Sequence, residues 1–473
     1  MTSFDSNNSR KKSGNEKWAQ VLVVFIATIV VFSNGLHIGW PAPSLPQLFS
    51  NEYPFEVSAE QGSYITIIGS LGAFFGCFIG NFILDKIGRR RCILLSALPQ
   101  ITSFLLLILS YQVMELLYVG RFIGGIGEGM VNTIVSIYVG EIAEPSIRGI
   151  LATMAGIAYY FGVLFVNIIG SYLSIRTTAS IFIAIPVLFI VLFWKMPESP
   201  YYLLMQKKDK QAEHVLKFLR RKSNVDEELT QLKADVDRQM SESGTFKDVF
   251  TIDSNRKAFF IMLGARFFQL TTGVSVMNFY IQILLKDATQ SVAPHIGASI
   301  ILLIQLVMTV LNMFIIDKWG RKPLLLFSVI GCFVNLLLQM VFFILKEYTS
   351  VDTSVADWFP LMMMMVLIFV YSLGLGSVVT VLQTEMFSAS IKAKLTCMVS
   401  GSYSLMILAI TKYYQATADG FGLSVPFSSF MVLTFVGVLF IFYLVPETKG
   451  KTLEQIQQKL KGGRKDKKVY NVA

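Results

Sequence analysis

The chain has 473 residues, of which 53% are hydrophobic and only 15% are charged, with a net charge of +10. A soluble domain carries roughly a quarter charged residues, so the composition excludes an ordinary soluble protein of this length. The basic residues lie in short segments between apolar runs and in the C-terminal stretch KLKGGRKDKKVY. Cytoplasmic loops next to anionic lipid select for such a distribution. We therefore expect membrane lipid as the partner of these charges, and no nucleic acid.

Apolar runs long enough to cross a bilayer recur twelve times. A helix needs about 20 predominantly apolar residues to span the hydrocarbon core. The predicted spans are 19–40, 62–84, 92–111, 116–139, 150–172, 178–195, 257–284, 292–316, 324–346, 358–381, 397–418 and 424–444. The sequence therefore predicts an all-α membrane protein with twelve transmembrane helices.

The charges of the loops predict the orientation. Basic residues follow the even-numbered spans two, four and eight, namely Lys86, Arg89, Arg90, Arg91, Arg148, Lys318, Arg321 and Lys322. The segment after the first span instead carries Glu52, Glu56 and Glu60, without Lys or Arg. By the positive-inside rule both termini are cytoplasmic. The first 18 residues are polar and basic, as in a cytoplasmic tail and unlike a signal peptide.

Five segments follow from these spans. A polar stretch of about 60 residues between spans six and seven shows amphipathic spacing typical of short helices. We predict a cytoplasmic N-terminal tail at 1–18, a six-helix bundle at 19–204, a cytoplasmic linker with short helices at 205–256, a second six-helix bundle at 257–448 and a cytoplasmic C-terminal tail at 449–473.

Three motifs occur once in each half, in the same order. DKIGRR at 85–90 recurs as DKWGRK at 317–322, EIAEPSIRG at 141–149 is echoed by EMFSASIKA at 385–393, and PESP at 197–200 matches PETK at 446–449. Parallel repeats of this kind are found in carriers that move two six-helix bundles around a central site. The two bundles are thus predicted to be structural repeats.

Acidic and basic residues of these motifs are predicted to lie together at the cytoplasmic helix ends. Ion pairs that break as the bundles separate would favour one of two states, and a few kcal/mol is sufficient to bias the populations. We call this set the cytoplasmic latch; it comprises Asp85, Arg89, Glu141, Arg148, Glu198, Asp317, Arg321, Glu385, Lys392 and Glu447. The alternative is that these charges only determine the topology.

The motifs GRFIGGIGEG (120–129), YVGEIAEPSIRG (138–149), PESPYYL (197–203), DKWGRK and PETKGKTLEQIQ (446–457) resemble those of the sugar porter family of the major facilitator superfamily. More loosely, the chain resembles the insect facilitated trehalose transporters. The resemblance covers essentially the whole chain. It implies the major facilitator fold and a sugar path through spans one, four, five, seven, eight, ten and eleven.

The resemblance also implies substrate-binding residues, which are Gln269, Thr272, Ser275, Gln305 and Thr380. Side-chain amides and hydroxyls suit a sugar because they donate to and accept from its hydroxyl groups. Gln269, Thr272 and Ser275 are spaced i, i+3 and i+6, which places them on one face of a continuous helix. We expect that face to line the path.

Several positions depart from the family pattern. Leu270 stands where a second glutamine is usual, Ser275 and Gln305 replace asparagines, Gly156 replaces a frequent glutamine and Thr380 replaces a tryptophan. The latch motifs are intact, whereas the sugar-binding positions are altered. This combination is typical of a carrier whose substrate differs from that of its relatives.

Two further charged or titratable residues lie within the predicted spans. Arg121 in span four is either a functional intramembrane arginine or an interfacial anchor, and His37 in span one is expected to be a structural histidine. The run of Gly124, Gly125, Gly127 and Gly129 indicates close helix packing rather than phosphate binding.

The predicted function is a carrier for a sugar or related polyhydroxylated solute. No Asp or Glu occurs between residues 18 and 51, whereas proton-coupled relatives usually carry an acid in span one, so facilitated diffusion by a uniporter is favoured. A carrier of another small organic solute and a non-transporting nutrient sensor are the alternatives. We expect no enzyme activity, no cofactor and no metal, and the resemblance implies the plasma membrane.

Overall fold

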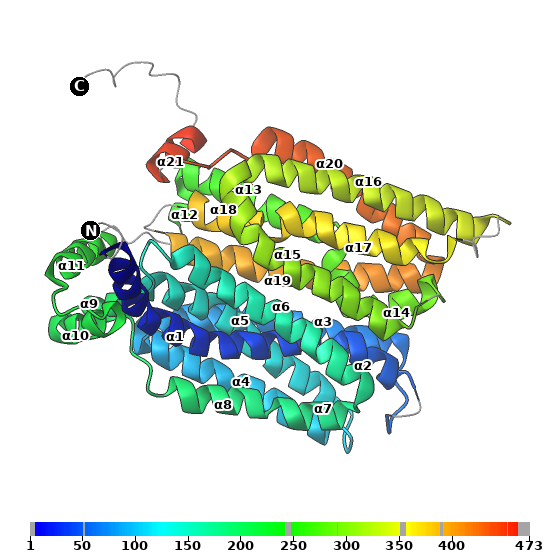
Figure 1. The fold of residues 1–473 in the computed structure, drawn as a ribbon. Helices are drawn as coiled ribbons and strands as arrows, with labels where there is room; N and C mark the ends of the chain where they lie inside the picture. The colour runs from blue at the N-terminus through cyan, green and yellow to red at the C-terminus, as the bar shows by residue number, and fades with distance from the viewer. Residues whose placement is uncertain are drawn as a thin grey trace.

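A computed structural model describes residues 5–50, 53–241, 247–290, 292–350, 356–387, 391–451 and 453–461. Twelve helical spans in these residues are long and apolar enough to cross a membrane, which confirms the predicted all-α membrane fold with twelve transmembrane helices. They lie roughly parallel to one another (Figure 1).

The first half contains spans one to six. Spans two to five are single helices, whereas spans one and six each consist of two consecutive helices. The elements are α1 (Asp5–Gly39) with α2 (Pro41–Leu48), α3 (Ala59–Ile87), α4 (Arg89–Leu109), α5 (Glu115–Ile142), α6 (Arg148–Tyr172), and α7 (Ile175–Phe182) with α8 (Ala184–Phe193).

The second half contains spans seven to twelve. Spans seven and ten are interrupted, span ten by the π-helical turn η2. The elements are α13 (Asp253–Leu270) with α14 (Val274–Ala288), α15 (Pro294–Trp319), α16 (Arg321–Tyr348), α17 (Phe359–Tyr371) with η2 (Ser372–Gly376) and α18 (Val378–Met386), α19 (Lys392–Phe421), and α20 (Ser424–Leu444).

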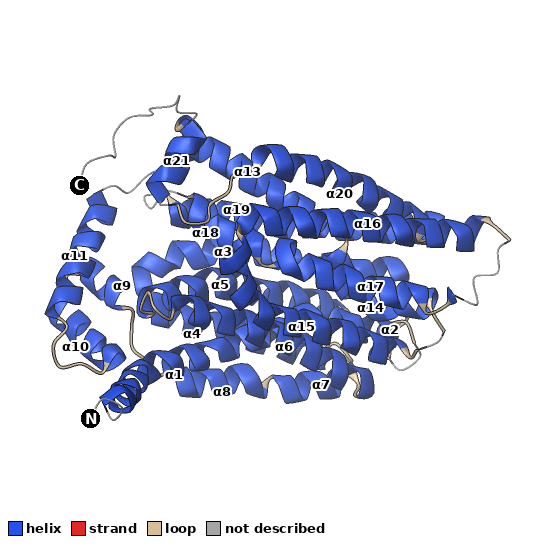
Figure 2. Ribbon diagram, turned by 45° about the horizontal axis from the view of Figure 1, so that its top comes forward, coloured by secondary structure: helices blue, strands red, loops and turns tan. Residues whose placement is uncertain are grey.

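Short helices gather at one end of the bundle, which we call the linker end. They are α9 (Pro200–Met205), α10 (Asp209–Arg220), α11 (Asp226–Ser241) and α12 (Asp248–Thr251) between the halves, and α21 (Leu453–Lys461) after the last span. Figures 1 and 2 both show α9, α10, α11 and α21 at this end, beside the start of α1. The linker and both terminal helices therefore lie at the same face of the molecule.

Large apolar side chains cover much of the outer surface. Phe82 is 67% exposed, Trp194 62% and Tyr443 75%, and each belongs to or follows directly after a membrane span. Exposed apolar area on this scale would be unfavourable in water. Hydrocarbon chains of a bilayer can cover it, which agrees with the twelve apolar spans.

Glycines allow close packing of α3 against α5. A Cβ atom added at Gly125 would lie 1.9 Å from the carbonyl oxygen of Gly69, and one at Gly129 would lie 2.1 Å from that of Ala73. No side chain fits at such distances, so the helix backbones touch directly. The structure thus confirms the packing role predicted for this glycine run.

Span seven corrects one prediction. The spacing of polar residues predicts a continuous helix over 269–275, but α13 ends at Leu270 and α14 begins at Val274. Gly273 has φ +76°, in the left-handed region that glycine adopts without steric cost. Gln269 and Ser275 therefore lie on different helices, and the single polar face expected for Gln269, Thr272 and Ser275 does not form.

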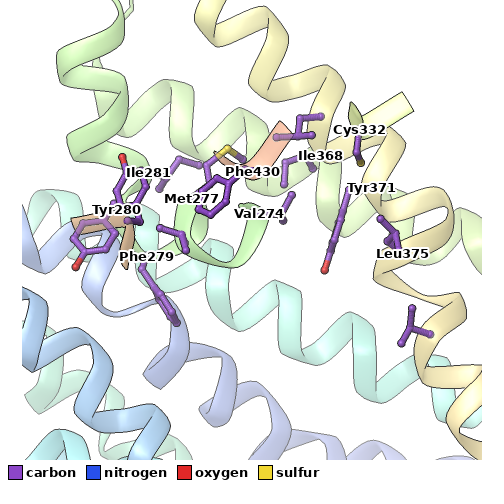
Figure 3. Close-up of a cluster of buried hydrophobic side chains, with 14 of the residues drawn as sticks. Val274, Met277, Phe279, Tyr280, Ile281, Cys332, Ile368, Tyr371, Leu375 and Phe430 are labelled. Atoms are coloured by element: carbon purple, nitrogen blue, oxygen red, sulfur yellow. The ribbon is translucent and has the colours of Figure 1, made fainter. Parts of the chain in front are cut away.

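Apolar packing holds the second part of this broken span in place. Val274, Met277 and Ile281 of α14 are buried, and Figure 3 shows them with Phe430 of α20 and Ile368 of α17. Tyr371 stands at the edge of the same cluster, with its hydroxyl directed away from the apolar side chains (Figure 3). The cluster thus carries polar groups at its border.

Candidate functional site

An ion-pair network at the linker end of the first half is centred on Arg89. Its Nε lies 3.1 and 3.0 Å from the carboxylate oxygens of Glu141, and Nη1 lies 3.1 Å from Asp85. Arg89 is only 4% exposed. The Ser199 hydroxyl also donates to Glu141. This network ties the end of α3, the start of α4 and the end of α5 to the segment that follows span six.

The second half repeats this arrangement around Arg321. Its Nε and Nη2 donate to Glu385 at 3.2 and 2.8 Å, and the Thr448 hydroxyl donates to the other carboxylate oxygen of Glu385 at 2.5 Å. Arg321, Glu385 and Thr448 thus correspond to Arg89, Glu141 and Ser199. The repeated motifs of the sequence build the same contacts twice. Contrary to the prediction, each of these ion pairs joins residues of one half and need not break as the bundles separate.

A carboxylate of the PES and PET motifs binds backbone N–H groups in each half. Glu198 accepts from Arg90 N at 3.0 Å, and Glu447 accepts from Arg321 N at 3.1 Å and Lys322 N at 2.9 Å. Partial burial raises the pKa of Glu447, but its backbone donors outweigh burial and hold the pKa below its usual value. Each carboxylate thus accepts hydrogen bonds from backbone N–H groups in the first turn of α4 or α16.

The remaining predicted latch residues are placed less centrally. Arg148 is exposed and donates to the Ala143 carbonyl at 3.3 Å. The side chains of Asp317 and Lys392 lie outside the described residues. Sequence reasoning missed Arg220 of α10, which is 4% exposed and contacts Glu228 at 2.7 Å. A long polar linker gave no signal that one of its arginines is buried.

A second polar cluster lies inside the membrane-spanning region and is centred on Arg266 of α13. Its Nη1 donates to Gln269 at 2.9 Å, and its Nη2 lies 2.7 Å from Gln383 and 3.4 Å from Thr380, both on α18. Its guanidinium also lies over the ring of Tyr403 on α19, 5.1 Å from the centroid. Three different spans therefore meet around one arginine, and we call this group the Arg266 cluster.

Two predicted substrate residues, Gln269 and Thr380, belong to this cluster. Gln269 is 3% exposed, and besides accepting from Arg266 it donates to the Leu375 carbonyl at 2.7 Å. Thr380 is exposed. In the structure as it stands, the amide of Gln269 is satisfied by protein groups, and Thr380 is the more accessible of the two.

The other predicted substrate residues occupy different positions. Gln305 of α15 is 2% exposed and lies near Tyr160 of α6, which belongs to the other half. Among the described residues its Oε1 has no hydrogen-bond partner. Thr272 is fully buried and donates to the backbone carbonyl of Gln269 at 2.8 Å, whereas Ser275 is half-buried at the start of α14. Gln305 thus lies at the boundary between the halves.

Tyr403 of the Arg266 cluster belongs to α19, which packs against α3 of the first half, and Gln305 belongs to α15, which packs against α6. The cluster, Gln305 and Tyr160 together form a polar region between the two halves. Sequence reasoning missed Arg266, Gln383 and Tyr160. The available signal for Arg266 was a charged residue inside the apolar run FFIMLGARFF, since such residues are rare and functional by default.

Two charged residues of span four lie inside the first half. Arg121 is 4% exposed, and its Nη1 donates to the His37 carbonyl at 2.6 Å while its guanidinium lies 5.1 Å from the Trp40 ring. It is therefore buried between helices and is not an interfacial anchor. Glu128, which sequence reasoning did not single out, interacts electrostatically with Arg121. The His37 ring stacks on Phe104 at 4.2 Å.

The end opposite the linker end is joined by hydrogen bonds between the halves. Gln282 of α14 donates to Asn167 and to Ser171 of α6, both at 2.8 Å. Asn167 in turn donates to Ser299 of α15 at 3.0 Å. Beside this junction lies a cavity of about 380 Å³, lined by Tyr280, Tyr414 and residues of both halves.

Residues 20–460 match the family described as sugar (and other) transporter. The chain belongs to this family. Its similarity to solved structures is in agreement at the level of the fold: the proton:xylose symporter XylE, bound to 6-bromo-6-deoxy-D-glucose, superposes with a TM-score of 0.75 at 21% identity, covering 95% of this chain and all of XylE. An inward-open form of XylE from E. coli gives 0.74 at 21% identity, covering 92% of this chain and 99% of that one.

Curated relatives of this family member are insect proteins. The facilitated trehalose transporter Tret1-1 of Drosophila simulans is 31% identical over 450 residues, and trehalose transporter 1 of Drosophila melanogaster is 30% identical over the same length. Each alignment covers 94% of this chain and 52% of the relative. The chain thus spans about half the length of the curated relatives it matches.

Proposed function

We propose that this membrane protein carries a sugar or a related polyhydroxylated solute by facilitated diffusion with alternating access. The observation that carries the proposal is the polar region between the halves, where Gln269, Gln305 and Thr380 lie close to Tyr160 and Arg266. Amides, hydroxyls and aromatic rings together provide donors, acceptors and an apolar face for a sugar. Broken helices near the bilayer midplane are the usual location of solute sites in carriers of this architecture.

The similarity to facilitated trehalose transporters supports both the solute class and the passive mechanism. The sequence of span one, which lacks Asp and Glu between residues 18 and 51, supports the absence of proton coupling. The structural neighbour XylE is a proton symporter, but at 21% identity it supports only the shared fold. A uniporter is therefore the proposed mechanism.

The linker end is proposed to be cytoplasmic, with both termini in the cytoplasm and the protein in the plasma membrane. The basic residues Arg89, Arg90, Arg91, Arg321 and Lys322 all lie at this end, as the positive-inside rule requires. The hydrogen bonds of Gln282 and Asn167 then close the extracellular end. This arrangement corresponds to a conformation that is closed to the outside.

The networks of Arg89 and Arg321 are proposed to act as the cytoplasmic latch. The contacts described above join partners within one half each, so they hold together the helix ends that must meet when the cytoplasmic side closes. Loss of either network would disorganise the helix ends of that half, so they would pack less well against the other half when the cytoplasmic side closes. The latch thus works by organising each half rather than by bridging the two.

A counterflow experiment in proteoliposomes tests the proposed function. Vesicles containing the purified full chain are loaded with unlabelled trehalose, glucose or another sugar and diluted into the same labelled sugar. We expect transient accumulation of label for at least one sugar without any ion gradient, with protein-free vesicles as the control. Binding of a sugar without exchange would instead favour the non-transporting sensor.

A further inference from the structure

We propose that the solute carries an anionic group, a carboxylate or a phosphate, in addition to its hydroxyl groups, and that Arg266 binds this group. The inference rests on the proposed function as a carrier and specifies the chemical class of its solute. It follows from the position of Arg266, the charge of its partners and its access to the space between the halves.

Arg266 lies deep in the membrane-spanning region. It is 13 residues from Asp253, the first residue of α13, and at 1.5 Å per residue this places it about 20 Å from the linker end of the helix. A charged side chain at such a depth is costly and normally pairs with an opposite charge or faces a water-filled cavity. The chain therefore keeps this charge against a considerable energetic penalty.

The protein partners of Arg266 leave its charge uncompensated. Its described contacts are the amides of Gln269 and Gln383, the hydroxyl of Thr380 and the ring of Tyr403, all of which are neutral. Among the described residues no Asp or Glu forms an ion pair with it, in contrast to Arg89 and Arg321. Its Nε is buried and has no hydrogen-bond partner among the residues that the structure describes.

The guanidinium is nevertheless within reach of a solute. Arg266 and Tyr403 are half-buried rather than enclosed, and Thr380, 3.4 Å from Nη2, is exposed. Tyr403, whose ring lies beneath the guanidinium, belongs to α19, which packs against α3 of the other half, so the cation lies near the boundary across which the halves move. A planar guanidinium with free donor capacity is well suited to carboxylate and phosphate oxygens.

Glu128, an acidic residue of span four, does not act as the counter-ion of Arg266. Glu128 of α5 interacts electrostatically with Arg121 of its own half. The described contacts of Arg266 with Tyr403, Gln269 and Gln383 are instead all with neutral groups. Span four thus contains an acid with a basic neighbour, whereas no Asp or Glu forms an ion pair with Arg266 in the part of the chain that the structure describes.

Matched solutes test the inference on the full-length protein. Glucose, glucuronate and glucose 6-phosphate share a ring and differ in charge, and the carboxylate and phosphate arms distinguish the two sources of the anionic group. Binding is measured by thermal shift of the purified protein, and transport by competition with labelled sugar in counterflow. At least one acidic solute should bind about tenfold or more tightly than glucose, the ratio expected of a hydrogen bond to a charged group.

Variants separate charge recognition from a merely structural role. Arg266→Gln should abolish the preference, so that glucose and the acidic solute bind with equal affinity, and Arg266→Lys should retain part of the preference. Arg238→Gln, which removes an exposed arginine of α11, is the matched control and should change nothing. Because the preference is also measured in the wild-type protein, the test stands even if Arg266→Gln fails to fold.

Three results would overturn the inference. Glucose binding as tightly as both acidic solutes in the wild-type protein would show that Arg266 is structural, and the proposed carrier function would stand. A preference that persists in folded Arg266→Gln would assign the anion to another group. If neutral sugars and both acidic solutes neither bind nor exchange, the proposed function fails together with the inference.

Discussion

The side-chain amide of Gln282 donates a hydrogen bond of 2.8 Å to the amide oxygen of Asn167 and thereby joins the two halves at the end opposite the linker end. Both residues are buried, and Asn167 donates onward to Ser299 of α15 at 3.0 Å. A buried amide that loses its partner costs about 1–3 kcal/mol. These contacts are therefore strong enough to influence which end of the proposed carrier is open.

Gln282→Leu should shift the population toward conformations that open at this end, because the Asn167 amide oxygen loses the hydrogen bond that Gln282 donates to it from the other half. Spin labels at Gln112 and Tyr348, which lie near this end in opposite halves and are both exposed, should move apart in distance measurements. The four native cysteines are buried, so background labelling is low.

Gln339→Leu is the matched control for this variant. Gln339 donates to Asn335 at 2.6 Å, and both residues belong to α16, so this change removes a buried amide contact without affecting the junction. Its label distances should equal those of the wild-type protein. Equal distances in Gln282→Leu as well would mean that the junction does not control opening.

The sequence predicts the spans well because bilayer thickness sets their length and apolar composition reveals it. It also indicates the two linker-end networks, since a repeated acid and base at matching positions imply matching contacts. Arg89 with Glu141 and Arg321 with Glu385 are brought together in this way. Only the structure shows that these ion pairs form within each half and not between the halves.

The central site is less accessible to sequence reasoning. The break at Gly273 is hidden because a single glycine is also tolerated within an apolar helix. The sequence therefore predicts one continuous helix that carries Gln269, Thr272 and Ser275 on the same face. The contacts of Arg266 with Thr380 and Gln383 connect positions 114 and 117 residues apart. No local pattern encodes such a pairing, so the position of α18 against α13 had to come from the structure.

Arg89→Ala and Arg321→Ala should each weaken closure of the linker end. Removing one partner of a buried ion pair costs about 3–5 kcal/mol, because the other charge is left uncompensated, and the cost should be smaller for Arg321, whose pair with Glu385 is partly exposed. The fraction of inward-open protein should rise, and a cysteine introduced at the exposed Thr380 should react faster with a thiol reagent added from the linker side. Sealed inside-out vesicles provide that access.

Arg238→Ala, which breaks an exposed pair with Asp235, is the control for general charge removal and should leave the labelling rate unchanged. Labelling that is the same in both latch variants and in the wild-type protein would reduce Arg89 and Arg321 to topology determinants. Folding of the variants is verified by size-exclusion profiles before labelling.

Gly88→Ala should lower the melting temperature more than Gly320→Ala. Both glycines have positive φ, +94° and +91°, in a conformation that other residues adopt only at a cost of about 1–3 kcal/mol. A Cβ at Gly88 would also lie 2.5 Å from Glu198 Oε2, whereas one at Gly320 would lie 3.1 Å from Glu447 Oε2. Thermal unfolding in detergent measures the difference. Gly149→Ala, whose Cβ would meet nothing within 4 Å, is the control, and equal stability of all three variants would contradict the prediction.

An imposed proton gradient should not drive solute accumulation, because span one lacks an acidic residue in its membrane-spanning part. Uptake into proteoliposomes is compared at equal pH on both sides and with the outside acidified, with an uncoupler as the control. Solute-dependent alkalinisation of the outer medium would show coupling. Its loss in Glu128→Gln would then assign the proton to the one acid that span four holds beside Arg121.

Gln269→Ala and Gln305→Ala should each weaken the apparent affinity for a polyhydroxylated solute at normal expression. Each amide offers two donors and two acceptor lone pairs, and leaving a buried partner unpaired costs about 1–3 kcal/mol, or roughly 5- to 150-fold in affinity. Ser275→Ala should have a smaller effect, because one hydroxyl makes fewer contacts. Concentration-dependent counterflow gives the affinities, and surface labelling gives the expression.

The two glutamine variants should differ in thermal stability. Gln269 already donates to Leu375 and accepts from Arg266, so Gln269→Ala also frees the guanidinium and should lower thermal stability along with affinity. Gln305 keeps an Oε1 without a partner among the described residues and lies near Tyr160 across the boundary, so Gln305→Ala should lower affinity with little loss of stability. Unchanged affinity in both variants would place the solute outside this polar region, and unchanged affinity in Gln305→Ala alone would confine the site to the second half around Arg266.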